Sequence, residues 1–244
     1  MSSAAPTVDL AVPDSALAIG AHPDDIDFGC GATLAKWTKA GCRVTELVLT
    51  DGSKGTWDPD ADTAALVALR QEEQRAAAAR LGAAEVRFGG MVDGALQSGL
   101  EERSIVCRVI RETRPAVVLG HDPWKHYRLH PDHRHAGWLA VEGIVAARDP
   151  FFFPDQGLAP HRPSHLLLWE AEVVDHVENA DGHLTDKLEA LLSHRSQWRS
   201  TMRIDTDPDQ ERARFEERIA TRLAEMGAAA GLRYAEAFKR IDRL

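Results

Sequence analysis

The chain has 244 residues, which is enough to bury a substantial core, and we expect one α/β domain over residues 1–244. Its 44% apolar and 27% charged residues are typical of a globular protein in water. The net charge of −9 argues against nucleic acid or an anionic membrane as the main partner, and no apolar run approaches the roughly 18 residues that cross a bilayer. The first residues lack the basic start and the long apolar stretch of a signal peptide, so we expect a cytoplasmic protein.

Short apolar runs and helical stretches alternate through the first two thirds of the chain. The expected strands cover 15–21, 43–52, 84–90, 116–122 and 165–171. The expected helices cover 31–41, 63–82, 100–115, 131–147, 184–199 and 209–243. This alternation predicts βαβ units, and therefore an α/β fold with a Rossmann-like, mostly parallel sheet and helices on both faces. The proline-rich segment 149–165 is expected to be a loop, either packed on its own aromatic rings or facing a substrate.

Two short motifs place histidines and aspartates at expected strand ends. "HPDD" (22–25) follows the first long apolar run, and "HPDH" (130–133) opens the helix that comes after the strand 116–122. In an open α/β sheet, ligands bind at the carboxyl ends of the strands, so we expect both motifs and the active site at this edge. Imidazole and carboxylate groups together suit zinc or a similar divalent ion, held at three points with one position left open.

The spacing within the two motifs predicts separate roles for their residues. His22 and Asp25 are three residues apart in a turn and can chelate one ion, while Asp24 between them faces the remaining coordination position. A carboxylate there can take a proton from metal-bound water, whose pKa the ion has lowered to about 7. Of His130 and His133, one can be the third ligand while the other faces a substrate.

Other interpretations of these residues stay open. Asp132 can hold the orientation of the substrate-facing ring through a hydrogen bond. "HPDD" on its own is also compatible with a helix-capping turn, in which the aspartates stabilise the positive end of the helix. His121, His126 and His135 are weaker candidates for metal ligands, because histidine-rich surface loops are common and because His135 faces another side of its helix than His133.

Other classes of enzyme fit the sequence less well. A dinucleotide-binding dehydrogenase would carry a GxGxxG loop after its first strand, where this chain has "AHPDDIDFG". A two-metal phosphoesterase remains an alternative, since Asp51 or Asp122 could supply an additional carboxylate. A serine hydrolase is disfavoured because there is no GxSxG motif.

Taken together, "AHPDDIDFGCGATLA", "LTDGSKGT", "LRQEEQRAAAARLG" and "LHPDH", in this order, resemble the LmbE-like, or PIG-L-type, zinc-dependent N-deacetylases. That family includes the mycothiol-pathway deacetylase and the mycothiol S-conjugate amidase. "LTDKLEALLSHRSQW" and "GLRYAEAFKRI" resemble its C-terminal segments, so the resemblance covers nearly the whole chain. It implies a metal-dependent hydrolase of linear amides, acting on a small-molecule substrate from which it removes an N-acetyl or other N-acyl group. The substrate would be an amino sugar or sugar conjugate, with a thiol S-conjugate or a natural-product amide as the alternatives.

The resemblance also assigns roles to single residues. It implies one Zn²⁺ per chain, a place that Fe²⁺ or another divalent ion could take, with three ligands: His22, Asp25 and His133. Asp24 matches the general base. His130 matches the histidine that assists the tetrahedral intermediate or the departing amine, with Asp132 modulating it.

Two further positions match the substrate-binding side of the family. Arg70, in "LRQEE", takes the place of an arginine that contacts the sugar, and Asp93, in "GGMVDGAL", falls where a substrate-side acidic residue is found. The chain departs from the mycothiol branch at residues 26–28 and in the position of Tyr127, which leaves the particular substrate open. The sequence also leaves open whether the chain forms a homo-oligomer.

Overall fold

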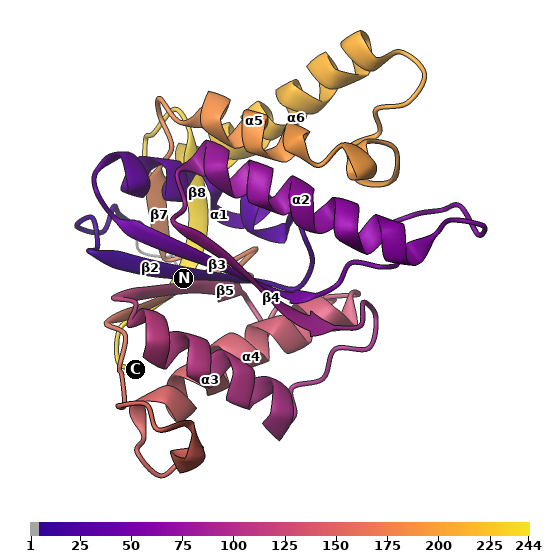
Figure 1. The fold of residues 1–244 in the computed structure, drawn as a ribbon. Helices are drawn as coiled ribbons and strands as arrows, with labels where there is room; N and C mark the ends of the chain where they lie inside the picture. The colour runs from indigo at the N-terminus through magenta and orange to yellow at the C-terminus, as the bar shows by residue number, and fades with distance from the viewer. Residues whose placement is uncertain (1–4) are drawn as a thin grey trace.

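The computed structural model describes residues 5–244 as an eight-stranded sheet with helices on both faces (Figure 1). The strands are β1 (Thr7–Val8), β2 (Ser15–Gly20), β3 (Arg43–Thr50), β4 (Glu85–Met91), β5 (Val117–His121), β6 (His165–Trp169), β7 (His176–Asn179) and β8 (Ala235–Ile241). The helices are α1 (Asp25–Lys39), α2 (Thr63–Leu81), α3 (Leu100–Thr113), α4 (Pro131–Arg148), α5 (Leu184–Ser193) and α6 (Pro208–Ala228). Three short helical turns cover Pro154–Gln156, Arg195–Gln197 and Trp198–Met202.

The strand order is β1-β7-β8-β6-β5-β2-β3-β4, and all neighbouring pairs are parallel except the two that involve β8. The expected α/β fold with a mostly parallel sheet is therefore confirmed. The central strands β2 and β5 are buried on both faces, which is why they appear in the sequence as continuous apolar runs.

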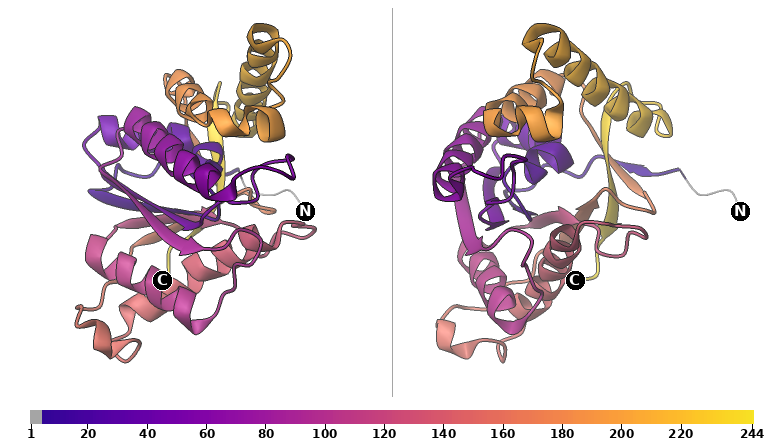
Figure 2. Two further views of the ribbon diagram at one scale, coloured as in Figure 1. Left: turned by 45° about the vertical axis from the view of Figure 1, so that its right-hand side comes forward. Right: turned by 90° about the vertical axis from the view of Figure 1, so that its right-hand side faces the viewer.

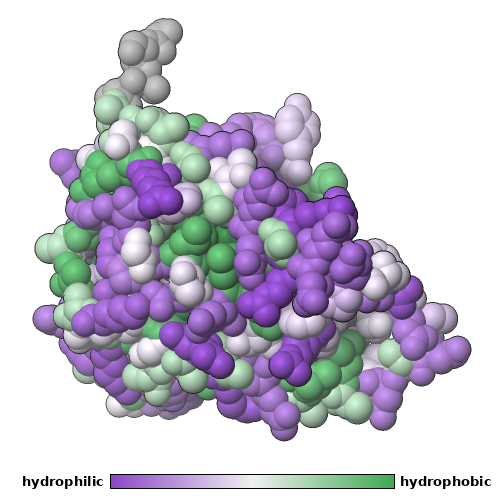
Figure 3. Space-filling view, turned by 90° about the horizontal axis from the view of Figure 1, so that it is seen from above, coloured by the Kyte–Doolittle hydropathy of each residue, from purple (hydrophilic) through white to green (hydrophobic). Residues whose placement is uncertain are grey.

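The sheet separates two apolar layers. In β2, Leu17 and Ile19 point to the layer beneath α3 and α4, while Ala16 and Ala18 point to the layer beneath α1 and α2, because successive side chains of a strand alternate between its faces. Helix α5 packs on α1 and α2, and α6 lies beside α5 and packs on β8, at the top of Figure 1. Seen from that side, the surface is mostly hydrophilic, with smaller apolar areas between the charged side chains (Figure 3).

Helix α1 begins earlier than the sequence pattern indicates, at Asp25 within the "HPDD" motif instead of near residue 31. Its backbone is kinked at Cys30, which interrupts the apolar spacing on which the expectation was based. The ammonium group of Lys187 donates to two carbonyl oxygens in the turn before the kink, and the carboxylate of Glu236 accepts from two backbone amides after it. Lys187 and Glu236 also pair with each other at 2.5 Å, so a buried ion pair satisfies the polar groups that the kink exposes.

The expected helix over 209–243 is wrong in its second half. Helix α6 ends at Ala228, and the chain then turns through Gly231, whose φ of +69° is the left-handed conformation that favours glycine. It returns as β8, which lies antiparallel between β6 and β7. Alanine and arginine are the most frequent residues after Ala228 and favour a helix, but burial of Phe238 in the sheet decides the conformation of this segment. The expected helix over 184–199 is likewise shorter, since α5 ends at Ser193.

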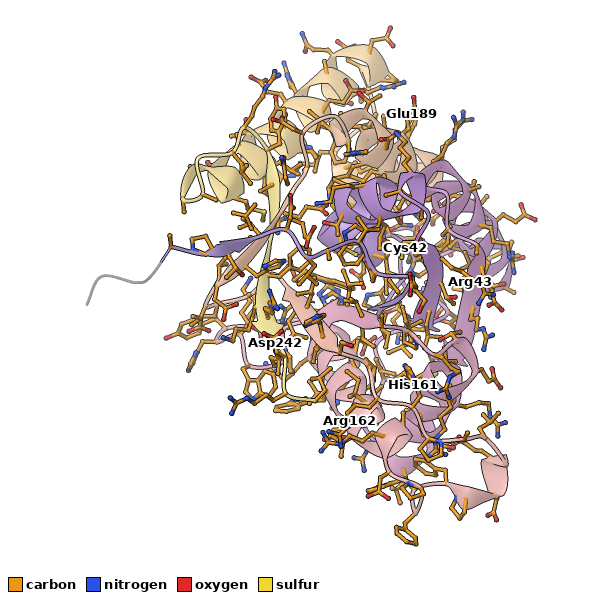
Figure 4. The ribbon with its side chains drawn as sticks, turned by 90° about the vertical axis from the view of Figure 1, so that its left-hand side faces the viewer. Cys42, Arg43, His161, Arg162, Glu189 and Asp242 are labelled. Atoms are coloured by element: carbon orange, nitrogen blue, oxygen red, sulfur yellow. The ribbon has the colours of Figure 1, made fainter. Side chains whose placement is uncertain are left out.

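The figures show the two sides of the molecule at which the parallel strands begin and end. Arg43, at the start of β3, and Asp242, just after the antiparallel β8, are labelled on the side that faces the viewer in Figure 4. The carboxyl ends of the parallel strands lie at the opposite side, which faces the viewer in the right panel of Figure 2. No helix of the described residues is long and apolar enough to cross a bilayer.

The segment 149–165 is a loop, as expected, and it is tied to the C-terminal end of α4 by one buried side chain. Arg111 of α3 is 4% exposed and donates to five backbone carbonyl oxygens, those of Ala146, Ala147, Asp149, Phe152 and Phe153. Two of these carbonyls belong to the last turn of the helix, where no intrahelical amide can reach them. The guanidinium group therefore caps the helix and fixes the start of the loop.

We expect Arg111→Met to lower the free energy of unfolding by about 2 kcal/mol, because five backbone carbonyl groups would each lose the hydrogen bond from the guanidinium group. Urea denaturation followed by circular dichroism measures this change. Arg108→Met, at an exposed position of the same helix, is the matched control and should change the stability by less than about 0.5 kcal/mol. Equal stability of both variants would show that the Arg111 contacts contribute little.

Candidate active site

A cavity of about 490 Å³ opens at the carboxyl edge of the sheet. Seven of the eight site residues expected from the sequence line it: His22, Asp24, Asp25, Arg70, Asp93, His130 and His133. The eighth, Asp132, is fully buried behind His22. The structure thus brings residues from four separate stretches of the chain to one place.

The peptide group between Pro23 and Asp24 is held at both ends by side chains from α2. Arg70 donates to the carbonyl oxygen of Pro23 at 2.7 Å, and the amide of Asp24 donates to the side-chain oxygen of Gln74 at 2.8 Å. Arg70 and Gln74 are four residues apart, so they lie on the same face of the helix. Asp24 itself has a φ of 95°, a left-handed conformation that costs about 1–3 kcal/mol for a residue with a side chain. The contacts from α2 hold this backbone conformation in place.

The carboxyl group of Asp24 lies in the cavity with 7% of the residue exposed. Burial raises the pKa of Asp24 to about 6, against the opposing effect of the Arg70 guanidinium, which lies 3.5 Å from the carboxylate. A carboxylate with a raised pKa that faces a cavity is typical of a general acid or base.

Asp25 stands between two imidazole rings. Its Oδ2 lies 3.3 Å from Nδ1 of His22, and its Oδ1 lies 3.2 Å from Nε2 of His133. One donor atom from each of these three residues lies within 4.8 Å of the others, which is the arrangement that a divalent ion with two nitrogen ligands and one oxygen ligand needs. The three residues are the ones that the sequence motifs single out.

The other ring nitrogen of His22 faces two further carboxylates. Nε2 of His22 lies 3.2 Å from Oδ1 of Asp93 and 3.2 Å from Oδ2 of Asp132. The same Asp132 oxygen accepts from the amide of Gly94 at 2.6 Å. Asp132 was expected to orient the ring of His130, but the imidazole to which it is hydrogen-bonded is that of His22, an arrangement typical of outer-sphere carboxylates at metal-binding histidines.

The electrostatics of the cluster favour a cation. Burial alone would lower the pKa of His22, yet its contacts with Asp132, Asp25 and Asp93 outweigh burial and raise that pKa to about 12. The same surroundings that stabilise an imidazolium stabilise a divalent cation held by the ring and by Asp25. The donor set and its charge therefore fit a metal ion.

His130 stands at the mouth of this cluster, at the residue before α4. Its ring stacks on that of His133 at 4.8 Å between centroids and meets the ring of His22 edge-on at 4.7 Å. Partial burial, and then the positive charges of His22 and His133, lower the pKa of His130, which favours its neutral form at neutral pH. A neutral imidazole on the open side of the site can exchange a proton with a bound molecule.

Arg70 lines the cavity but is almost fully buried. The guanidinium group is 3% exposed and donates to the carbonyl oxygens of Gly52 and Pro23, so it forms the floor of the cavity. A Cβ atom at Gly55 would collide with this group, and one at Gly52 would lie 2.7 Å from it. Both glycines of the "DGSKG" segment are therefore needed for the loop to close over Arg70.

Of the remaining histidine and aspartate candidates, one lies in the cluster and the others make contacts elsewhere. His121 lies in the cluster, with Nε2 3.3 Å from Asp25, although the sequence made it only a weak candidate. His126 pairs with Glu172 in an exposed loop, and His135 contacts Ser98. Both strand-end aspartates that could have extended the site accept from backbone amides of loops: Asp51 from Ser53 and Asp93, and Asp122 from Trp124 and Glu172.

Comparison with known proteins identifies the class of protein to which this fold and this site belong. The family model described as PIG-L, GlcNAc-PI de-N-acetylase, matches residues 17–144. The chain belongs to this family, as the sequence motifs predicted.

Several relatives cover most of the chain. The diacetylchitobiose deacetylase of Thermococcus kodakarensis is 34% identical over 226 residues, which are 91% of this chain and 81% of the relative. The 1D-myo-inositol 2-acetamido-2-deoxy-alpha-D-glucopyranoside deacetylase of Streptomyces scabiei is 34% identical over 58% of this chain and 51% of its own length. The structure of N,N'-diacetylchitobiose deacetylase from Pyrococcus horikoshii superimposes with a TM-score of 0.85 and 29% identity, covering 94% of this chain and 84% of that one.

Behind the site, Gln74 connects Asp24 to a buried polar network. Its amide nitrogen donates to Glu46 at 2.9 Å and to Asp27 at 3.1 Å, and Asp27 in turn contacts His194 at 2.9 Å. Glu46 is fully buried. Burial, and then the negative charge of Asp27, raise the pKa of Glu46 well above its usual value.

The raised pKa of Glu46 predicts a pH dependence of stability. The folded protein keeps the carboxyl proton at pH values where the unfolded chain, with a pKa near 4.5, has lost it. This stabilisation is therefore complete below the unfolded pKa and is lost as the pH rises toward the folded pKa, by about 1.4 kcal/mol per pH unit.

Glu46→Gln removes the titration while keeping an acceptor for Gln74. Urea unfolding at pH 5, 6, 7 and 8 should show the variant gaining stability over the wild type as the pH increases. Glu101→Gln, at an exposed position, should follow the wild-type curve. Parallel curves for Glu46→Gln and the wild type would contradict the prediction.

Proposed function

We propose that this protein is a metal-dependent amide hydrolase that removes an N-acetyl or other N-acyl group from an amino sugar or a sugar conjugate. The observation that carries the proposal is the convergence of His22, Asp25 and His133 on one point of the cavity, with the carboxyl group of Asp24 beside it. The deacetylase names of the relatives support the reaction, and the same names support a sugar as the substrate.

The ion would be held by His22, Asp25 and His133, through one imidazole nitrogen from each histidine and one oxygen of Asp25. When bound, it would act as a Lewis acid that polarises the acyl carbonyl group and lowers the pKa of a water molecule. Zinc suits two nitrogen ligands and one carboxylate, and Fe²⁺ is the alternative. We propose one ion per chain, because Asp51 and Asp122, which a second ion would need, accept from loop amides and belong to none of the groups of donor atoms that could hold an ion among the described residues.

The residues of this chain have distinct tasks in the hydrolysis. Asp24 accepts a proton from the water that attacks the acyl carbon, since its carboxylate faces the cavity and is oriented by Arg70. His130, on the open side of the cluster, donates a hydrogen bond to the oxygen that becomes negative in the tetrahedral intermediate. The departing amine takes a proton from Asp24 or from His130. The products are a carboxylate, acetate for an N-acetyl substrate, and a free amine.

The cavity supports a sugar-sized substrate. Its volume of about 490 Å³ exceeds what an acetamide group alone would fill, and most of the residues that line it carry polar or charged groups. Asp93, which the sequence placed on the substrate side, lies at the cavity wall and also contacts His22. We propose a contact with a sugar hydroxyl for Asp93, whereas Arg70 acts through Asp24 and the surrounding backbone.

The first experiment is metal analysis of the purified protein together with an assay of free amine release from N-acetyl sugars, sugar conjugates and thiol conjugates. About one zinc-like ion per chain with amine release from a sugar substrate supports the proposal. Release only from a thiol conjugate or a natural-product amide keeps the reaction and changes the substrate. A protein that binds no divalent ion even after zinc is added contradicts the proposal.

Two single substitutions separate the roles of the proposed base and a proposed ligand. Asp24→Asn should keep the metal content and lower kcat by about 10²- to 10⁴-fold, because the amide cannot accept the proton. His133→Ala should lose the metal and with it the activity, because the ion keeps only two protein ligands. Metal content by mass spectrometry and initial rates at saturating substrate measure both effects. Normal rates in both variants would contradict the assignment.

A further inference from the structure

Two buried side chains at adjacent strand ends, His121 and Trp169, have no direct part in the proposed reaction. His121 is the last residue of β5 and Trp169 the last residue of β6, and the two face each other in the register of the parallel pair. Each is 1% exposed. We propose that they form a positioning pair that fixes the carboxylate of Asp25 for metal binding, an inference that rests on the proposed function.

The contact between the two rings determines which nitrogen of His121 carries the proton. The indole Nε1 of Trp169 donates to Nδ1 of His121 at 3.0 Å. An indole nitrogen can only donate, so Nδ1 must be the unprotonated, accepting nitrogen, and the proton of the neutral ring is on Nε2. Glu170 lies 3.6 Å from Nδ1, beyond hydrogen-bond distance, and does not compete for this position.

The protonated nitrogen of His121 points at the proposed metal ligand. Nε2 lies 3.3 Å from Oδ2 of Asp25, and among residues 5–244 this buried nitrogen makes no hydrogen bond to any other group. The same Asp25 oxygen accepts from the backbone amide of His22 at 2.8 Å. Two donors thus converge on Oδ2, which leaves Oδ1, on the side of His133, as the oxygen that binds the ion.

This arrangement also excludes His121 as a ligand. His121, His133 and Glu170 have donor atoms close enough to suggest a second metal position. A nitrogen that carries a proton cannot bind a metal, and the other nitrogen of His121 is occupied by Trp169. His121 therefore serves the ligand Asp25 and does not itself bind an ion.

The indole is held in place by close packing against α1. A Cβ atom at Gly29 would lie 2.6 Å from the Trp169 ring, so only glycine lets the helix approach the indole this closely. Asp25 begins the same helix. The packing of one turn of α1 on Trp169 thus fixes both ends of the chain of contacts from Trp169 through His121 to Asp25.

Three substitutions test the pair, with zinc affinity measured by competition with a chromophoric chelator. His121→Leu should weaken zinc binding about 10- to 100-fold, the range for loss of an outer partner of a metal ligand. His121→Gln should stay within a few-fold of the wild type, because its amide nitrogen reaches the same position and donates. The zinc affinity of Trp169→Phe should lie between those of the two His121 variants. The imidazole of His121 is kept in this variant, but the indole no longer fixes which ring nitrogen carries the proton. His126→Leu, in the exposed loop, is the control and should match the wild type.

The melting temperature of each metal-free variant separates positioning from packing. The proposal expects His121→Leu and His121→Gln to differ in zinc affinity more than in metal-free stability. Equal loss of affinity in both, or wild-type affinity in His121→Leu, would overturn it. The proposed function fails independently, if the wild type binds zinc but releases no amine from any N-acyl substrate.

Discussion

The geometry of the site depends on a single peptide group, the one between Pro23 and Asp24. Its carbonyl oxygen and its amide are each bonded to a side chain of α2, and these bonds keep Asp24 in a left-handed conformation that it would not adopt alone. The residue before Pro23 and the residue after Asp24 are the proposed ligands His22 and Asp25. One clamp from a neighbouring helix therefore sets the position of the general base and the spacing of two ligands at once.

A second constraint is the balance of buried charge. The carboxyl groups of Asp25, Asp93 and Asp132 surround the ring of His22, and Arg70 is the nearest permanent cation to Asp24. Carboxylates in a poorly solvated cavity repel one another unless positive charge lies between them. An ion held at this point would reduce the repulsion, so the features that give the site its reactivity also bind the ion.

The sequence predicted the site better than it predicted its surroundings. "HPDD" and "HPDH" follow strands whose carboxyl ends meet at one edge, so their convergence could be inferred from chain order alone. The contact between His121 and Trp169 depends on the register of two strands that are 48 residues apart, which no local spacing reveals. The partner of Asp132 depends in the same way on tertiary packing. Strand β8 was missed because its alanine and glutamate content is that of a helix, while its position between two strands is set by the rest of the sheet.

The position of β8 has a consequence for the order in which the molecule can be assembled. β8 is the last strand of the chain to be synthesised among residues 5–244, yet it lies between β6 and β7, and β1 is attached only to β7. During synthesis on the ribosome, β1 and β7 therefore cannot pair with the rest of the sheet until β8 has emerged. Glu236 of β8 also completes the ion pair that supports the kink of α1. The helix that begins at Asp25 thus gains its full support only when β8 is in place, so a nascent chain that lacks this strand holds the active-site motifs without the complete scaffold.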